Sequence, residues 1–252
     1  MLEIRNVSKV YDDGTHALRE VTFNVKDGEF LVIIGLSGSG KSTLLRCINR
    51  LIEPSSGQII YHGQNVTAAN PAELRRIRRQ IGMVFQHFNL VKRSSVLNNV
   101  LSGRLGYVST LPSLLGIWST ADKALAMANL ELVGIAHKAQ NRADELSGGQ
   151  QQRVGIARAL MQNPTLMLAD EPVASLDPAL SDSVMQYFEK LNQERGTTVL
   201  CSLHVLGLAR RYATRIIALK AGELVYDGDP QGIDEQRFRE IYGDEAVEHS
   251  LR

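Results

Sequence analysis

Phe30-Leu-Val-Ile-Ile34 runs directly into Gly35-Leu-Ser-Gly-Ser-Gly-Lys-Ser42, and this stretch decides the fold. Its first part is a short, continuous apolar run, as expected of a strand that is buried on both faces. The glycine-rich segment comes next, and a helical stretch follows it through Leu51. Strand, glycine loop and helix open a βα unit, which predicts an α/β fold with a mostly parallel sheet.

The glycine-rich segment has the complete spacing of a phosphate-binding loop, Gly35-x4-Gly40-Lys41-Ser42. Glycines let the backbone wrap phosphates, so that amide N–H groups and a helix N-terminus point at the anion. Lys41 is expected to reach the β- and γ-phosphates, and the Ser42 hydroxyl to bind Mg²⁺. A chance glycine-rich turn is the alternative, which the flanking strand and helix disfavour. The loop predicts nucleotide binding but does not indicate what the nucleotide drives.

A second buried strand ends in acids, in Leu166-Met-Leu-Ala-Asp170-Glu171. A carboxylate at the end of such a strand can orient the Mg²⁺ shell, a role that we assign to Asp170. Glu171 beside it is placed to polarise the attacking water as a general base. Surface capping by two acids is the simpler alternative, and the phosphate loop upstream makes it the minor one. The two motifs together predict a P-loop NTPase.

A further anion-binding helix start is predicted at Leu146-Ser-Gly-Gly-Gln150. One nucleotide does not need two such sites from one chain. Two chains arranged head to tail would each offer this segment across the interface, giving two shared ATP sites. A generic helix cap is the alternative, and alone this pentapeptide would be only moderately specific.

The remaining segments alternate between strand and helix patterns, except in the middle of the chain. The first 30 residues read as strands with a turn at Asp12-Asp13-Gly14, and Ser181 to Arg195 reads as a helix. Further strands are expected at Thr197 to Leu203 and Ile216 to Leu219. Between about residues 88 and 162 the helix signal dominates, which predicts a helical subdomain inserted into the core. The basic cluster near Asn70-Pro71 is interpreted as a solvated helix face, with a binding patch as the alternative; its members are Arg75, Arg76, Arg78 and Arg79.

Composition limits the function classes. The chain has 252 residues, 28 Lys and Arg against 27 Asp and Glu, and 44% hydrophobic residues, which argues against disorder. A net charge of +1 argues against a protein that mainly holds nucleic acid phosphates. Cys47 and Cys201 are too few for a disulfide framework and fit a reducing compartment. No apolar run is long enough for a membrane span, and the first residues do not resemble a signal peptide, so a cytoplasmic protein is expected.

These motifs, in this order, resemble those of the ATP-binding subunit of an ABC transporter over nearly the whole chain. In that comparison Gly35 to Ser42 is the Walker A loop, Asp170 ends the Walker B strand, and Leu146 to Gln150 is the signature. Gln86 in Met-Val-Phe-Gln86 matches the Q-loop glutamine, and Ser175-Leu-Asp177 matches the D-loop. His204 matches the switch histidine that senses the γ-phosphate, and Tyr11 lies where the family stacks an aromatic ring on adenine. Leu36 departs from the proline of many relatives, with no expected loss of ATP binding.

The resemblance implies an ATPase that uses ATP and Mg²⁺, with Glu171, His204 and Lys41 as catalytic residues. Ser42, Gln86 and Asp170 are the implied metal-binding residues. The implied nucleotide-binding residues are Tyr11, Gly35, Ser37, Gly38, Ser39, Gly40, Lys41, Ser42, Thr43, Gln86, Asp170, Ser147, Gly148, Gly149 and Gln150. The implied architecture is a single ATP-binding domain over residues 1–252. An α/β core with an antiparallel N-terminal β subdomain takes residues 1–87 and 163–228, the helical subdomain takes 88–162, and a C-terminal helix and tail take 229–252.

Finer resemblances point to importers, and among them to the ATP-binding components of phosphonate importers. The stretches that carry this likeness are Arg46-Cys-Ile-Asn-Arg-Leu51, Gln86-His-Phe-Asn-Leu-Val91, Gly103-Arg-Leu-Gly-Tyr107 and Ala169-Asp-Glu-Pro-Val-Ala-Ser-Leu-Asp-Pro178. The implied partners are a second copy of the chain, integral membrane permease subunits and, indirectly, a periplasmic or extracellular substrate-binding protein, with no nucleic acid. The implied location is peripheral, on the cytoplasmic face of the plasma (inner) membrane.

Three points stay open at this stage. A soluble, non-transport ABC ATPase of nucleic acid repair, translation or a phosphonate-degrading complex would share the same motifs. The cargo is open among phosphonates, phosphite, phosphate esters and other oxyanions. The apolar segment from Gly103 to Trp118 is expected to divide between core of the helical subdomain and a surface for a membrane partner.

Phe238, Ile241 and Tyr242 predict a docked terminal helix with a loose end after it.

Overall fold

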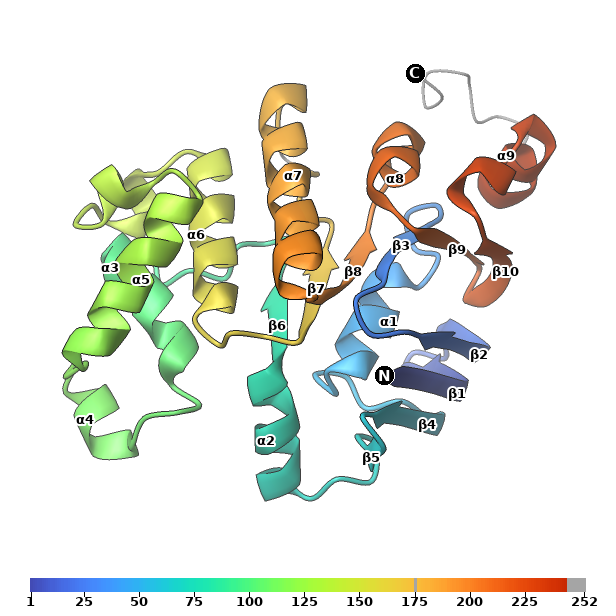
Figure 1. The fold of residues 1–252 in the computed structure, drawn as a ribbon. Helices are drawn as coiled ribbons and strands as arrows, with labels where there is room; N and C mark the ends of the chain where they lie inside the picture. Colours follow the sequence, from blue (N-terminus) through green and yellow to red (C-terminus); the bar gives the residue numbers. More distant parts are fainter. Residues whose placement is uncertain (175, 244–252) are drawn as a thin grey trace.

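A six-stranded sheet forms the centre of the molecule (Figure 1). The structure is a computed structural model, and it describes residues 1–174 and 176–243. Ser175 of the expected D-loop and residues 244–252 of the expected tail lie outside the described residues. The strand order is β10-β9-β3-β8-β7-β6, built from β3 (Phe30–Ile34), β6 (Ile81–Val84), β7 (Leu166–Asp170), β8 (Thr198–Ser202), β9 (Arg215–Lys220) and β10 (Glu223–Gly228).

Five neighbouring strands of this sheet are parallel, and β10 pairs antiparallel with β9 at one edge. The mostly parallel sheet predicted from the sequence is therefore confirmed. Because parallel strands all end at the same edge, the segments after β3, β6, β7 and β8 meet there. This single edge positions the candidate site.

A second sheet covers part of the first and confirms the predicted antiparallel β subdomain. Its order is β2-β1-β4-β5, with β1 (Leu2–Val10), β2 (His16–Val25), β4 (Ser56–Tyr61) and β5 (Gln64–Asn65). The predicted turn joins its first two strands: the Gly14 N–H donates to the Tyr11 carbonyl at 2.9 Å. Gly14 takes a φ of 83°, which a glycine adopts without strain.

Alternating side chains of the central strands serve two separate cores. Leu31, Ile33 and Leu168 point to one face, where they pack with the antiparallel sheet and with α1 (Lys41–Ile48). Phe30, Val32 and other residues point to the opposite face, which is covered by α6 (Gly148–Leu160), α7 (Pro178–Arg195) and α8 (Leu206–Tyr212). Both faces are therefore buried, as the continuous apolar run of β3 predicted.

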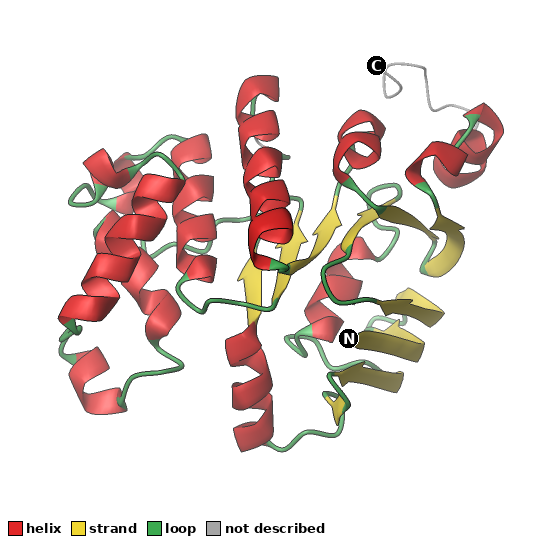
Figure 2. Ribbon diagram, in the orientation of Figure 1, coloured by secondary structure: helices red, strands yellow, loops and turns green. Residues whose placement is uncertain are grey.

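Residues 88–162, where an inserted helical subdomain was expected, are mainly helical, and Figure 2 shows these helices grouped beside the sheet. This segment contains α3 (Val96–Leu101), α4 (Thr110–Leu114), α5 (Thr120–Leu132), α6 and the 3₁₀ turns Ser102–Arg104, Ala136–Lys138 and Ala143–Glu145. Within this range the structure assigns no strand beyond an isolated bridge between Ser95 and Arg142.

Two helices end or begin at residues other than the predicted ones, one because of a backbone conformation and one because of a helix cap. The helix after the phosphate loop ends at Ile48 rather than Leu51, and Arg50 takes a φ of 48°, which stops a helix. α7 begins at Pro178, earlier than the predicted Ser181, because the Asp177 side chain accepts the Leu180 N–H at 3.0 Å and caps it.

The basic helix is α2 (Pro71–Gln80), and its arginines do not all face solvent as predicted. Arg78 donates to the Asn49 and Arg50 carbonyls at 3.0 and 2.7 Å, and burial lowers its pKa. Arg79 lies over the Tyr107 ring at 5.3 Å. Arg75, Arg76 and Arg79 are exposed, as expected. Part of the cluster is therefore structural.

The chain closes with a 3₁₀ turn, Pro230–Gly232, and with α9 (Glu235–Tyr242). Phe238 and Ile241 are buried, which confirms the predicted docked terminal helix. Among the helices of the described residues, none is long and apolar enough to cross a membrane.

Gly103 is where the inserted subdomain packs most closely. A Cβ at this position would lie 2.2 Å from the Arg158 carbonyl oxygen and 2.8 Å from the Met161 Cβ. At nearby Gly106, a Cβ would first meet the flexible side chain of Arg79, at 3.3 Å. The two glycines therefore differ in how much space the fold leaves beside them.

Replacing Gly103 with alanine is expected to lower the free energy of unfolding by about 1–3 kcal/mol, because the added methyl group overpacks a backbone contact. Gly106→Ala is the matched control and is expected to change stability by less than about 0.5 kcal/mol. Denaturant titration of both variants measures the difference. Equal stability of the two variants would contradict the packing argument.

Candidate active site

The predicted phosphate loop joins β3 to α1 and has a backbone that only glycine permits at two positions. Gly35 has a φ of 143° and Gly40 a φ of 105°. A Cβ would lie 2.2 Å from the Leu219 carbonyl oxygen at Gly35 and 2.4 Å from the Ala17 carbonyl oxygen at Gly40. A Cβ atom cannot lie this close to a carbonyl oxygen. Packing as well as backbone conformation therefore requires glycine at both positions.

Lys41 lies inside this loop and is 3% exposed. Its ammonium group donates to the Gly35 and Leu36 carbonyls at 2.8 and 2.9 Å. Burial lowers the pKa of Lys41, and the nearby carboxylates of Glu171 and Asp170 offset part of this effect. The loop thus holds a desolvated cation close to two acids.

Two loop hydroxyls differ in their surroundings. The Ser39 hydroxyl is buried and has no hydrogen-bond partner within the described chain. Ser42, at the start of α1, donates to the Asp170 Oδ1 atom at 2.7 Å. On the loop's outer side, Ser37 and Gly38 are exposed.

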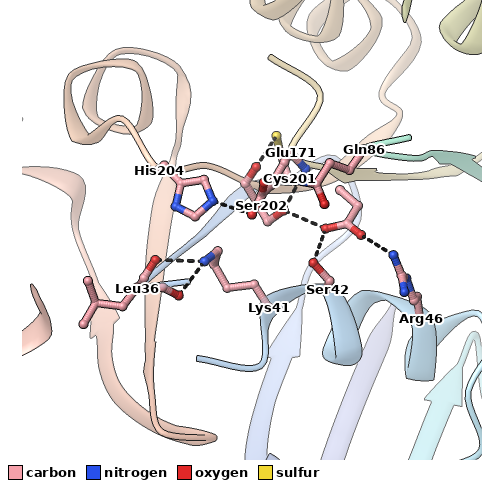
Figure 3. Close-up of polar contacts among 11 residues, drawn as sticks. Leu36, Lys41, Ser42, Arg46, Gln86, Glu171, Cys201, Ser202 and His204 are labelled. Carbon is pink, nitrogen blue, oxygen red and sulfur yellow. Dashed lines mark hydrogen bonds and ion pairs between the residues drawn. The ribbon is translucent and has the colours of Figure 1, made fainter. Parts of the chain in front are cut away.

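Asp170 ends β7 and its carboxylate is completely buried. Its Oδ1 atom accepts hydrogen bonds from the hydroxyls of Ser42 and Ser202, at 2.7 and 3.2 Å. Its Oδ2 atom lies 3.4 Å from a guanidinium nitrogen of Arg46. Ser42 and Arg46 come from α1 and Ser202 from β8, and all three are labelled in Figure 3.

Glu171 follows immediately and takes the left-handed backbone conformation, with a φ of 47°. Its Oε2 atom accepts a hydrogen bond from the Gln86 amide at 2.7 Å, and its Oε1 atom contacts His204 Nε2 (Figure 3). Non-glycine residues in this conformation cluster at functional sites, because the surrounding structure must hold them there. The predicted general base is therefore held by the predicted Q-loop and switch residues.

The sheet edge explains why these residues meet. Gln86 follows β6, Asp170 ends β7 with Glu171 directly after it, and His204 follows β8. Adjacent parallel strands bring together residues that are far apart in the sequence. The structure thus unites Lys41, Ser42, Gln86, Asp170, Glu171 and His204 in one cluster.

Tyr11 directly follows β1, and its side chain reaches the start of α1. It is 36% exposed, and its hydroxyl lies 3.2 Å from the Thr43 hydroxyl. The Lys9 ammonium group is 5.3 Å from the centre of its ring. This is a position from which an exposed ring can stack on a base.

The predicted signature segment lies at the N-terminus of α6. Ser147 and Gln150 cap the helix reciprocally: the Ser147 hydroxyl accepts the Gln150 N–H at 3.4 Å, and the Gln150 side chain accepts the Ser147 N–H at 3.1 Å. Ser147 and Gly148 are exposed, whereas Gly149 is half-buried. No hydrogen bond within the described chain joins this segment to the phosphate loop of the same chain.

The oxygen donors at the centre fit Mg²⁺. Mg²⁺ prefers hard oxygen ligands and is usually held by one or two protein groups, with waters and phosphates completing its shell. Ser42 and Asp170 supply a hydroxyl and a carboxylate in direct contact. The described residues contain no group of three or more His, Cys, Asp or Glu side chains placed for a metal.

Two residues at the site were not predicted from the sequence. Arg46 lies one helical turn after Ser42, so the i, i+4 spacing places both on one face of α1. Ser202 ends β8 and lies opposite Asp170 in the strand register. The spacing of Ser42 and Arg46 along the helix could have predicted the position of Arg46. The contact of Ser202 with Asp170 could not be predicted in this way, because it depends on which strands are neighbours.

Comparisons with known proteins agree with this geometry. The sequence model of the ABC transporter family matches residues 18–174. The phosphonates import ATP-binding protein PhnC of Bdellovibrio bacteriovorus is 57% identical over 247 residues, which cover 98% of this chain and 95% of that protein. The protein of the same name from Bacillus thuringiensis subsp. konkukian is 55% identical over 251 residues, which cover 100% of this chain and 98% of that protein.

Solved structures show the same fold. The dimeric post-hydrolysis state of the ATP-binding cassette MJ0796, bound to ADP and Pi, aligns with a TM-score of 0.81 and 38% identity, over 92% of this chain and 100% of that chain. The family match spans more than half of the chain, and the relatives span nearly all of it. The chain therefore belongs to the ABC transporter family, as one of its ATP-binding subunits.

Proposed function

We propose that this ABC ATPase drives the uptake of phosphonates, or of a related phosphorus oxyanion, through separate membrane permeases. The observation that carries the proposal is the identity of 55–57%, over nearly full length, to proteins named as phosphonates import ATP-binding proteins. The ATP-binding subunit does not itself select the cargo. The assignment therefore rests on relationship, and the rest of the proposal rests on geometry.

Two copies are proposed to act together. The exposed signature residues Ser147 and Gly148 of one copy would face the exposed loop residues Ser37 and Gly38 of the other. The solved structure of the MJ0796 cassette is dimeric, which supports the pairing of two copies. A pocket of about 650 Å³ beside Glu171 and His204, with a mainly apolar lining, provides further surface for a partner copy. Each chain would then complete the nucleotide site of its partner.

ATP fits the loop because the groups that would contact its phosphates already lie there. The buried Ser39 hydroxyl lacks an acceptor within the described chain, and a phosphate oxygen would supply one. Lys41 has its charge inside the loop, where it would exchange carbonyl oxygens for phosphate oxygens. Gly35 and Gly40 permit the backbone conformation of the loop, and the α1 N-terminus adds its dipole. Thr43 and Tyr11 lie next to the loop on the side proposed for the base.

In the proposed mechanism Glu171 accepts a proton from the attacking water. His204 orients one oxygen of its carboxylate, and the Gln86 amide nitrogen donates to the other. Ser42, Asp170 and the Gln86 amide oxygen would hold Mg²⁺, which would neutralise charge on the phosphates. The water oxygen bonds to the terminal phosphorus while the bond from that phosphorus to ADP breaks, and Lys41 stabilises the charge that develops on the phosphate oxygens. Closing of the dimer would exclude water from the reaction.

The helical subdomain supplies a surface for the permease. Val108 and Trp118 are half-buried, and six apolar or aromatic neighbours are exposed. We name these six residues the α4 surface: Leu105, Tyr107, Leu111, Leu114, Leu115 and Ile117. Leu111 and Leu114 are 72% and 80% exposed. An exposed cluster of this kind usually marks an interaction site, and a permease segment is the occupant that importer function requires.

The proposed setting follows from this partner. The protein would lie on the cytoplasmic face of the plasma membrane, held there by its permease. A periplasmic or extracellular binding protein would deliver the cargo to the other side. A soluble ABC ATPase of nucleic acid repair or translation is the alternative, and the near-zero net charge and named relatives favour transport over it.

Growth on a phosphonate as sole phosphorus source tests the function. A strain that lacks this gene and has no second importer is expected to grow only when the wild-type gene is returned. Glu171→Gln should fail to restore growth, because the variant loses its general base, and all strains should grow on inorganic phosphate. Extracts of the deletion strain should still cleave the phosphonate, which separates uptake from breakdown. Normal growth of the deletion strain would remove the cargo assignment and leave the ATPase intact.

The α4 surface is tested by fractionation. The double substitution Leu114→Ser, Leu115→Ser is expected to leave the ATPase activity of the purified protein within about twofold, because neither residue is part of the nucleotide site. Co-sedimentation with permease-containing membranes should fall. Val225→Ser, at an exposed apolar residue of β10 that is 41% exposed, is the control and should sediment like the wild type. Unchanged sedimentation of the double variant would exclude this surface.

Ser39→Ala is expected to act in opposite directions on stability and binding. Without nucleotide the variant should be as stable as the wild type or up to about 1 kcal/mol more stable, because an unpaired buried hydroxyl is removed. ATP affinity should fall by about fivefold, since a phosphate oxygen loses one donor. Thermal unfolding with and without ATP measures both effects. An unchanged ATP affinity would show that Ser39 does not contact the nucleotide.

A further inference from the structure

Ser202 connects the two acids of the active site through a single hydroxyl. The residue ends β8 and is completely buried. Its Oγ atom accepts a hydrogen bond from the Glu171 backbone N–H at 2.9 Å and donates one to the Asp170 Oδ1 atom at 3.2 Å. We infer that Ser202 is a positioning residue for ATP hydrolysis, which fixes the Glu171 backbone and the Asp170 carboxylate relative to each other.

The strand register makes this connection possible. Asp170 and Ser202 are the last residues of neighbouring parallel strands and lie opposite each other. The Glu171 N–H donates to the serine side chain at the point where β7 ends. The hydroxyl uses both its donor and its acceptor capacity, so the contact is fully satisfied in a buried setting.

The hydrogen bond from the Glu171 backbone N–H affects the orientation of the Glu171 carboxylate, the proposed general base. Glu171 has a φ of 47°, and a non-glycine residue stays in this region only when its surroundings hold it there. Ser202 holds the N–H of that residue. If the N–H is released, the backbone can rotate, and the carboxylate then loses its direction towards Gln86 and His204. Ser202 therefore acts through Glu171 without contacting the reacting atoms.

The hydrogen bond from the Ser202 hydroxyl to Asp170 affects metal binding. This second role of Ser202 rests on the metal-binding role proposed for Asp170. Oδ1 accepts from two hydroxyls, those of Ser42 and Ser202. If the Ser42 hydroxyl turns to the metal, Ser202 remains as the hydroxyl donor on that oxygen, and Arg46 remains beside Oδ2. The orientation of the carboxylate would then depend on Ser202.

Cys201, the preceding residue, provides the matched control. It is also completely buried, but it belongs to the hydrophobic core on the opposite face of the sheet. Its thiol makes no hydrogen bond to either acid among the described residues. Cys201→Ala therefore perturbs the packing of the same strand without removing a contact to Asp170 or Glu171.

The test uses the purified full-length chain with Ser202→Ala, Ser202→Thr, Ser202→Val and Cys201→Ala. Thr and Val have nearly the same volume, so that pair separates the hydroxyl from the space it fills. Steady-state ATP hydrolysis is measured against Mg²⁺ concentration. Binding of a fluorescent ATP analogue is measured in EDTA and in Mg²⁺, which gives a readout that does not require turnover.

Ser202→Ala is expected to lower kcat about tenfold and to raise the half-saturating Mg²⁺ concentration about threefold or more, as expected from the loss of two buried hydrogen bonds. Affinity for the analogue in EDTA should stay within about twofold, because Ser202 does not contact the phosphate loop. The gain in affinity that Mg²⁺ gives should shrink. Ser202→Val should behave like Ser202→Ala, and Ser202→Thr should recover most of the activity.

Three results would overturn the inference. The first is wild-type kcat and Mg²⁺ dependence in Ser202→Ala. The second is activity that follows side-chain volume, with Ser202→Ala near wild type and Thr and Val equally impaired. The third is an equal change in Mg²⁺ dependence for Cys201→Ala. All of these measurements use ATP alone, so a wrong cargo assignment would not affect them.

Discussion

A carboxylate without exposed surface must be hydrogen-bonded or paired, and Asp170 meets this requirement with three donors from two elements. Ser42 and Arg46 come from α1, and Ser202 comes from β8. These contacts tie the helix after the phosphate loop to the middle of the sheet. The relative position of the loop and the acids, on which every other feature of the site depends, follows from the need to satisfy one buried charge.

The remaining polar groups of the site also have partners within the chain. Lys41 donates to loop carbonyls, while Gln86 and His204 both contact Glu171. Binding of a phosphate would require Lys41 to exchange its loop carbonyls for phosphate oxygens. Such an exchange can be selective, because only a ligand that places phosphate oxygens in the loop replaces both contacts. Ser39 is the exception, since its buried hydroxyl has no partner in the described chain.

Sequence reasoning identified those parts of the site that depend on local patterns. The β3-loop-α1 unit, the acids after β7 and the capped start of α6 each lie within a short segment with a recognisable spacing. The sequence did not reveal Ser202, because its partners are set by the pairing of β7 with β8. Two helix ends differed from prediction because they depend on single residues. Arg50 ends the helix after the phosphate loop through its φ angle, and Asp177 sets the start of α7 by capping it. The predicted solvated face of α2 was wrong for Arg78, which bonds to carbonyls outside its own helix.

A continuous set of contacts joins Glu171 to the signature helix. Gln86 bonds to Glu171, and the two residues that follow Gln86 closely, Phe88 and Asn89, accept hydrogen bonds from Arg158 at 2.8 and 2.7 Å. Arg158 is on α6, and the N-terminus of α6 carries the signature. Burial lowers the pKa of Arg158, and its guanidinium group donates to those two carbonyls. Hydrogen bonds and the short chain segment from Gln86 to Asn89 therefore connect Glu171, the proposed general base, to the helix that begins with the predicted signature.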